Sequence, residues 1–190
     1  AKLLTVHPKN FVPAKREKML EKIRDEDFDG IIMAYSCFEQ IPLSENYYTD
    51  ELQNMKSKIN NLQSDSKKRT NSLKKKKEKL NKELSELIVS LSKINCGVYF
   101  DELGISRLYV DEAHNYKNVP IETKADNVLG ITRKGSKKCK DMLDKVRMIQ
   151  KSGGGVIMAT GTPITNSITD AFIMQKYLQN GELGLLDLES

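Results

Sequence analysis

The sequence contains no tryptophan and only three cysteines in 190 residues. The cysteines lie far apart and form no C-x-x-C pair, so neither a disulfide framework nor a cysteine-based zinc site is indicated. No apolar stretch approaches the roughly 20 residues that a membrane-spanning helix needs, and no signal-peptide pattern opens the chain. These absences favour a soluble protein of a reducing compartment, and we expect a cytoplasmic location and no membrane partner.

The sequence also lacks the phosphate-binding pattern G-x-x-x-x-G-K-[ST] of P-loop proteins. Its glycine cluster at residues 153–155 has no Lys-Ser or Lys-Thr behind it and precedes an apolar run. The hydrolase patterns G-x-S-x-G and H-E-x-x-H are absent as well. A Cys-His hydrolase that uses Cys37 and His114 is one hypothesis for the function, although nothing in the sequence brings these two residues together.

Positive charge is concentrated in one part of the chain. The net charge of +5 comes from 31 Lys and Arg against 26 Asp and Glu. Residues 55–82 alone hold eleven basic residues and two acidic ones, which leaves the remainder slightly acidic. This basic region is either a solvated surface that keeps the segment soluble or a contact for nucleic-acid phosphates or an acidic partner.

Apolar residues at spacings of three and four run through the same region and predict two helices. The first set is Leu52, Met55, Ile59 and Leu62, and the second is Leu73, Leu80, Leu84, Leu87, Leu91 and Ile94. A polar break separates the two sets, so we expect an antiparallel coiled-coil hairpin over residues 47–95. Its second arm would reach roughly 30 Å, at ~1.5 Å per residue.

Outside the hairpin, short apolar runs alternate with helical patterns, which is typical of a parallel α/β sheet. We predict strands at 3–6, 30–34, 107–110 and 155–159, in one parallel sheet with helices on both faces. Residues 1–46 and 96–190 would then be the two parts of one domain that the hairpin interrupts. Ligands bind at the carboxyl ends of such strands, and each run ends in polar, loop-forming residues.

Two of these strand ends carry distinctive motifs, "LYVDEAHNYKN" at 108–118 and "VIMATGTPITNS" at 156–167. Their order and separation resemble those of motifs II and III in the superfamily two helicases. The residues within the two motifs are similar to those of Swi/Snf-type translocases. Together with "FDGIIMAYSCFEQIPLS", they resemble the DEAD/DEAH-box helicase portion of very large proteins of phages and conjugative elements. Those proteins are often joined to an adenine-specific DNA methylase, which makes such a methylase a potential partner domain.

The resemblance implies a RecA-like first motor domain that uses ATP and magnesium. In that reading Asp111 holds magnesium through water and Glu112 accepts a proton from the attacking water. Coupling to the γ-phosphate would use His114, Thr160, Gly161 and Thr162, with Gly161 and Pro163 making a tight turn. A plain charged turn after a strand is the alternative interpretation of the carboxylate pair.

The resemblance also implies contacts with the phosphate backbone of a bound nucleic acid, DNA in preference to RNA. These contacts fall on the loops after the first two strands, at Lys9, Asn10, Tyr35 and Ser36. Backbone contacts of this kind position a strand without reading its sequence. Ordinary turn chemistry explains Pro and Asn residues at these places equally well.

We therefore expect part of an ATP-dependent DNA helicase or translocase motor. The sequence begins within a predicted strand and lacks a P-loop and a second RecA-like domain, so we expect the isolated chain to bind ATP poorly and to hydrolyse essentially none. A non-catalytic module, in which an α/β scaffold displays the coiled coil, is the competing hypothesis.

The basic hairpin generates the first prediction. Neutralising Lys74, Lys75, Lys76 and Lys77 to glutamine in the full-length protein should weaken DNA binding at low salt, with DNA-free ATPase activity unchanged. Four lost phosphate contacts would lower the log-log salt slope by up to ~3.6 on duplex DNA. Fluorescence anisotropy at several salt concentrations measures the slope, and an unaltered slope would leave these lysines a solubilising or protein-docking role.

Overall fold

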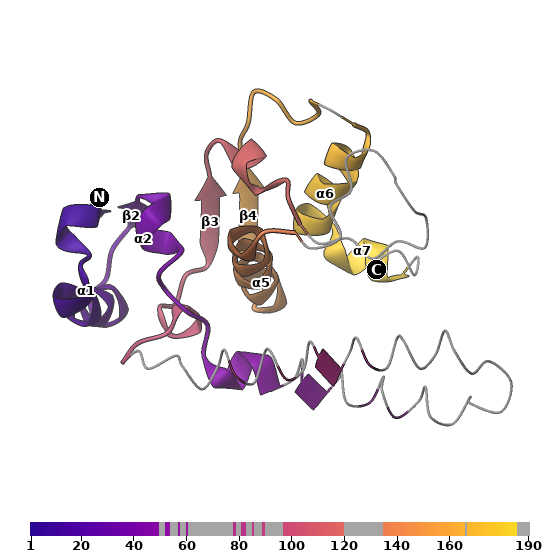
Figure 1. The fold of residues 1–190 in the computed structure, drawn as a ribbon. Helices are drawn as coiled ribbons and strands as arrows, with labels where there is room; N and C mark the ends of the chain where they lie inside the picture. The colour runs from indigo at the N-terminus through magenta and orange to yellow at the C-terminus, as the bar shows by residue number, and fades with distance from the viewer. Residues whose placement is uncertain are drawn as a thin grey trace, which may run out of the picture. The chain divides into compact units, whose positions relative to one another are not determined.

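The computed structural model describes residues 1–49, 97–119, 135–165 and 167–185, together with isolated positions between 52 and 89. The chain divides into two compact units, each built around one pair of strands (Figure 1). The first unit comprises Ala1–Ala34 and Gln40–Leu103, and the second comprises Tyr35–Glu39 and Gly104–Ser190. Within the described residues, no helix is both long and apolar enough to cross a membrane.

The first unit begins with a strand, a helix and a second strand that pairs in parallel with the first. Its elements are β1 (Leu3–Val6), the 3-10 helix η1 (Pro8–Asn10), α1 (Pro13–Asp25) and β2 (Gly30–Met33). Pro13 starts α1 because its fixed φ suits the first helical position, where its missing N–H costs nothing. Leu20 and Ile23, three residues apart, form the buried face of α1.

Of the predicted hairpin, residues 47–95, the structure describes only residues 47–49 and isolated positions between 52 and 89, all of which are helical. The residues on either side of it are described and lie side by side. The backbone N–H of Phe100, the first residue of the 3-10 helix η2 (Phe100–Glu102), donates to the carbonyl of Pro42 at 2.8 Å. Ser44 donates to Asp101 through its amide at 2.8 Å and its hydroxyl at 2.6 Å. The intervening segment therefore leaves and re-enters the unit at one place, as an inserted hairpin requires.

The second unit is organised around a second parallel strand pair and the helix that connects its strands. Its elements are α2 (Tyr35–Phe38), β3 (Arg107–Val110), the 3-10 helix η3 (Ala113–Tyr116), α5 (Lys137–Lys151), β4 (Gly155–Met158), α6 (Thr169–Leu178) and α7 (Asn180–Leu185). The hydroxyl of Ser136 caps α5 by accepting the Cys139 amide at 3.3 Å. The apolar face of α5 includes Met142, Val146 and Ile149, and α5 packs against β3 and β4.

The glycine cluster at residues 153–155 makes the turn from α5 into β4. Gly153 has a φ of +77°, a left-handed conformation that favours glycine after a helix. A Cβ on Gly154 would stand 2.5 Å from the carbonyl oxygen of Ser106, so only glycine fits there. The cluster thus has a structural role, consistent with its lack of a phosphate-binding pattern.

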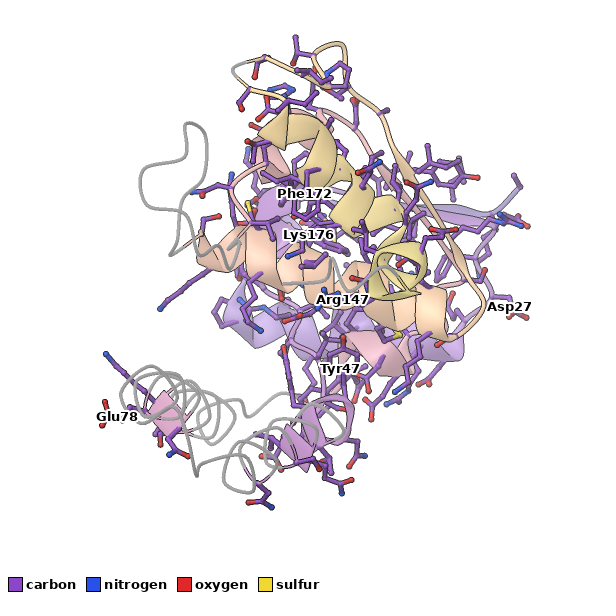
Figure 2. All side chains as sticks on the ribbon, turned by 90° about the vertical axis from the view of Figure 1, so that its right-hand side faces the viewer. Asp27, Tyr47, Glu78, Arg147, Phe172 and Lys176 are labelled. Carbon is purple, nitrogen blue, oxygen red and sulfur yellow. The ribbon has the colours of Figure 1, made fainter. Side chains whose placement is uncertain are left out.

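Helices α6 and α7 attach to α5 through side chains that emerge from its second half. Gln150 Nε2 donates to the Tyr177 carbonyl at 2.8 Å, and Arg147 Nη2 donates to Asn180 Oδ1 at 2.9 Å. Figure 2 labels Arg147 on α5 and Phe172 and Lys176 on α6; Lys176 Nζ lies 5.7 Å from the centre of the Phe172 ring. Ile168, the residue immediately before α6, is 79% exposed.

All four predicted strands are present, and their parallel direction within each pair is confirmed, but the single sheet is wrong. The described strands form two separate two-stranded sheets, β1 with β2 and β3 with β4. Each described strand pairs only with the strand at the other end of its own crossover, which runs through α1 in the first unit and α5 in the second. One apolar surface of each sheet stays open, where Ile32, Tyr109 and Ile157 are exposed.

Two buried tyrosines hold the core of the second unit by their hydrogen bonds. The Tyr177 hydroxyl lies 3.0 Å from the carbonyl oxygens of both Tyr116 and Cys139. The Tyr116 hydroxyl donates to Glu39 Oε1 at 3.3 Å. Burial raises the pKa of both hydroxyls well above the ordinary tyrosine value.

This burial predicts a loss of stability in alkali. The pKa of each hydroxyl is higher in the folded state than in the unfolded state, so its contribution to the free energy of unfolding is fully present below pH ~10. Above that pH the unfolded state ionises first, and the free energy of unfolding falls by up to ~1.4 kcal/mol per pH unit for each tyrosine. Urea unfolding between pH 8 and pH 11 should show this decline. Tyr177→Phe should reduce the slope, and an identical slope in the variant would contradict the assignment.

Candidate active site

The pairing of β3 with β4 brings two polar loops to one edge of the sheet. Val110 lies opposite Met158 in the parallel register. The ladder continues beyond both strands, since the Ala159 amide donates to the Val110 carbonyl at 2.8 Å and the Ala113 amide donates to the Ala159 carbonyl at 2.9 Å. Asp111, which lies between two residues of this ladder, and Thr160, which follows it, are therefore held at the same edge.

Asp111 and Glu112 are both exposed at this edge. One oxygen of Asp111, Oδ1, accepts the backbone amide of Glu112 at 2.9 Å. Glu112 has a φ of +45° and a ψ of +45°, the one positive φ among described residues other than glycine. This left-handed conformation ends the strand abruptly and starts η3, at a cost of roughly 1–2 kcal/mol.

Neighbouring hydrogen bonds fix the strained turn on both sides of Glu112. The Asp111 carbonyl accepts the hydroxyl of Tyr35, which comes from α2. The Glu112 carbonyl accepts the amide of Asn115 at 3.0 Å and its side-chain Nδ2 at 3.1 Å. A strained residue persists when the surrounding structure determines its conformation several times over, and strain of this kind concentrates at functional sites.

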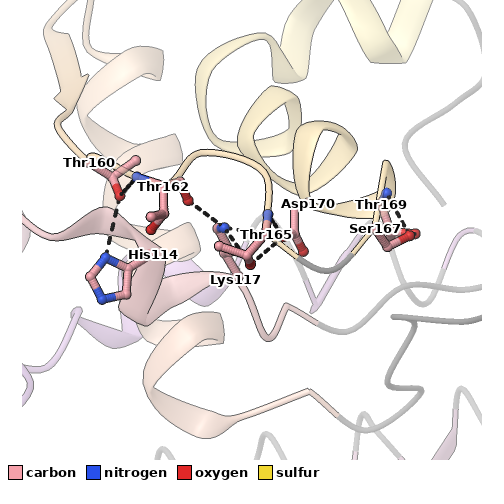
Figure 3. A network of polar contacts seen from close by, with 8 residues as sticks. All are labelled: His114, Lys117, Thr160, Thr162, Thr165, Ser167, Thr169 and Asp170. Atoms are coloured by element: carbon pink, nitrogen blue, oxygen red, sulfur yellow. Dashed lines mark hydrogen bonds and ion pairs between the residues drawn. The ribbon is translucent and has the colours of Figure 1, made fainter.

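His114 links the carboxylate pair to the loop that follows β4. Its Nδ1 lies 3.1 Å from Glu112 Oε2. The same atom lies 3.3 Å from Thr160 Oγ1, a contact drawn in Figure 3. Because a carboxylate only accepts hydrogen bonds, Nδ1 carries the hydrogen in the contact with Glu112. Thr160 Oγ1 also accepts the amide of Thr162 at 3.1 Å. The residues predicted from the two motifs are thus brought together in one constellation.

A model described as a probable helicase domain matches residues 1–190, the whole chain. The chain belongs to this family. Searches of curated proteins and of solved structures found no match. A helicase domain interacts with nucleic acid, so the exposed edge of the β3–β4 sheet belongs to a protein that works on a nucleic-acid strand.

Tyr35 occupies a different place in the helicase domain from the one we expected. We predicted a strand-end loop that touches nucleic acid, whereas Tyr35 begins α2 and directs its hydroxyl to the Asp111 carbonyl. Burial, and then the charges of Asp111 and Glu112, raise the pKa of this hydroxyl. Its ring packs edge-on against Tyr116, with centroids 5.4 Å apart. No sequence signal indicates this contact, because 76 residues separate Tyr35 from Asp111.

The other predicted nucleic-acid residues of the helicase domain are exposed. Lys9 and Asn10 lie in η1 of the first unit, and Ser36 lies in α2 of the second. Exposure is compatible with contacts to a phosphate backbone, and their role stays a prediction. We expected Gly161 and Pro163 to make a tight turn; the φ of Gly161 is not positive and an added Cβ would meet no atom within 4 Å, so the backbone at this position does not require glycine.

The structure does not favour a Cys-His hydrolase. Cys37 is fully buried in α2. His114 instead contacts Glu112 and Thr160 at the exposed edge. Reactive cysteines occupy partly exposed positions where a substrate can approach the thiolate, so the burial of Cys37 argues against a nucleophilic role.

The left-handed backbone at Glu112 predicts an inverted preference between alanine and glycine. Glu112→Gly should be more stable than Glu112→Ala by about 1 kcal/mol, because both remove the carboxylate but only glycine adopts a positive φ without strain. The matched control is Lys18, exposed within α1, where Lys18→Ala should be more stable than Lys18→Gly. Urea unfolding of the four variants measures both differences, and the same order at both positions would exclude strain at Glu112.

Proposed function

We propose that this helicase domain belongs to an ATP-dependent DNA helicase or translocase of the DEAD/DEAH-box, Swi/Snf-related type, as in the large proteins of phages and conjugative elements. It would be part of the first RecA-like motor domain, in which ATP hydrolysis drives movement on DNA. The observation that carries the proposal is the constellation at the β3–β4 edge, where His114 bridges Glu112 and Thr160.

Asp111 is proposed to hold the magnesium ion through a bound water. Among the described residues, no group of three or more His, Cys, Asp and Glu side chains could hold a metal by itself. An exposed lone carboxylate still fits Mg²⁺, which keeps several waters and is usually bound by one or two carboxylates together with substrate phosphates. When bound, the ion supplies positive charge that neutralises the phosphate oxygens. The chain has no P-loop pattern, so residues outside this sequence would provide the main phosphate contacts.

Glu112 is the proposed general base. Its side chain is 60% exposed and projects from a turn whose backbone is fixed independently of the carboxylate. A carboxylate held in this way can accept a proton from an attacking water. His114 would hold Glu112 in position and relate it to Thr160, so that a change at the nucleotide could pass into the loop at residues 160–165.

The nucleic-acid partner is proposed to be DNA, bound through its backbone. Lys9, Asn10 and Ser36 are exposed and suited to phosphate contacts. Tyr35 is the neighbour of Ser36 in the sequence, and its hydroxyl donates to the Asp111 carbonyl. A DNA contact at Ser36 would therefore be linked directly to the turn that carries the carboxylates. A second RecA-like domain, and potentially a methylase domain, would complete the protein.

The test is ATP turnover by the full-length protein. Glu112→Gln should lower kcat by about 10²–10⁴-fold, the usual contribution of a general base, with ATP binding retained. Asp111→Asn should instead weaken magnesium-dependent ATP binding. Glu21→Gln, on the exposed side of α1, is the matched control and should leave turnover unchanged. A phosphate-release assay and fluorescent-ATP titration separate the two effects, and normal turnover by Glu112→Gln would refute the base assignment.

A further inference from the structure

Lys117, one residue beyond η3, binds the loop after β4 at several points. Its Nζ donates to the Thr162 carbonyl at 2.6 Å, to Thr165 Oγ1 at 3.2 Å and to Asp170 Oδ2 at 3.1 Å (Figure 3). The side chains of Lys117 and Asp170 are only 12% and 9% exposed. Charged groups so nearly buried need their hydrogen bonds, and an ammonium group can donate three of them.

Asp170 ties the far end of the same loop to helix α6. Its Oδ2 accepts the amide of Thr165 at 2.8 Å and the Thr165 hydroxyl at 2.9 Å, as well as the Lys117 ammonium. Asp170 lies in the first turn of α6, where the helix dipole favours negative charge. The loop from 160 to 165 therefore ends on a charged, nearly buried anchor.

His114 reaches this loop from within η3, and Lys117 reaches it from the C-cap position that ends η3. They are three residues apart, and at 3-10 spacing residues i and i+3 lie one above the other. The two attachments differ in kind. His114 is 40% exposed and makes a single contact of 3.3 Å with Thr160, whereas Lys117 is nearly buried and makes three contacts.

We propose that Lys117 is a positioning residue, a fixed pivot for the loop at residues 160–165. Together with Asp170 and Thr165 it holds one end of the loop against η3, so that Thr160 at the other end stays within reach of His114. The His114–Thr160 contact can then break and re-form while the loop keeps its place. This inference rests on the proposed function, in which that contact senses the nucleotide.

The first experiment measures steady-state ATP hydrolysis by the full-length protein. Lys117→Met should lower kcat by about 10- to 100-fold, the usual effect of a small misplacement, and change KM for ATP by less than about twofold. Lys140→Met is the control, because Lys140 also forms an ion pair, of 3.0 Å, with a nearly buried aspartate, Asp144 on α5, although Lys140 itself is 49% exposed. It should retain the wild-type kcat. Lys117→Arg should recover part of the loss, because it restores the charge.

A purely structural ion pair would behave differently. Lys117→Met would then melt at a lower temperature and yet show the wild-type kcat below that temperature, and this result would overturn the proposal. A change in KM alone would overturn it as well. A failure of the proposed function would give a different result: the unmodified protein would not turn over ATP, or Glu112→Gln would turn it over normally.

A second experiment needs no ATP and covers the case in which Lys117→Met does not fold. Thr165→Val removes only the hydroxyl that Lys117 and Asp170 share. In hydrogen-exchange mass spectrometry of the full-length protein, peptides covering 160–165 should exchange about tenfold faster in Thr165→Val than in wild type. His114→Ala should leave their exchange within about twofold of wild type. Equal acceleration by both variants, or by neither, would show that Lys117 is not the pivot.

Discussion

The parallel pairing of β3 with β4 is the constraint on which the rest of the site depends. Parallel strands present their carboxyl ends at one edge, and the register that sets Val110 against Met158 also sets the loop after one strand against the loop after the other. A shift of one residue would reverse the sides of the sheet on which the side chains lie and would separate Asp111 from Thr160. Helix α5 secures this register, because it connects the two strands and buries its apolar face against them.

The same helix also holds the element that supports the turn at Asp111 and Glu112. Lys145 of α5 is completely buried, and its ammonium donates to the Phe38 carbonyl at 2.9 Å and to Asp141 at 2.6 Å. Burial lowers the pKa of Lys145 and raises that of Asp141, so each depends on the other for its charge. The ammonium fixes the end of α2, and the beginning of α2 is Tyr35, which hydrogen-bonds the Asp111 carbonyl. A buried charge far along α5 thus helps to place the turn at the sheet edge.

Sequence patterns predicted the parts of this arrangement that depend on neighbouring residues. The run Leu108 to Val110 followed by two acids predicted a strand and its polar end, and β3 ends at Val110. The patterns could not predict contacts between residues that lie far apart in the sequence. Lys117 and Asp170 are 53 residues apart, and each alone reads as an ordinary surface charge. The single sheet failed for a related reason, since period and composition indicate strands but not which strands stay unpaired on one side.

The hydrogen bonds that fix the main chain at Glu112 do not involve its side chain. Hydrogen bonds from Tyr35, Asn115 and the ladder at Ala113 fix the peptide groups on both sides, and none of these involves the Glu112 carboxylate. The backbone strain is therefore balanced by hydrogen bonds to the main chain, while the carboxylate stays exposed beside His114. The main chain thus fixes the position of residue 112, while its side chain stays accessible to solvent. A strained residue persists here because the neighbouring hydrogen bonds determine its backbone conformation several times over.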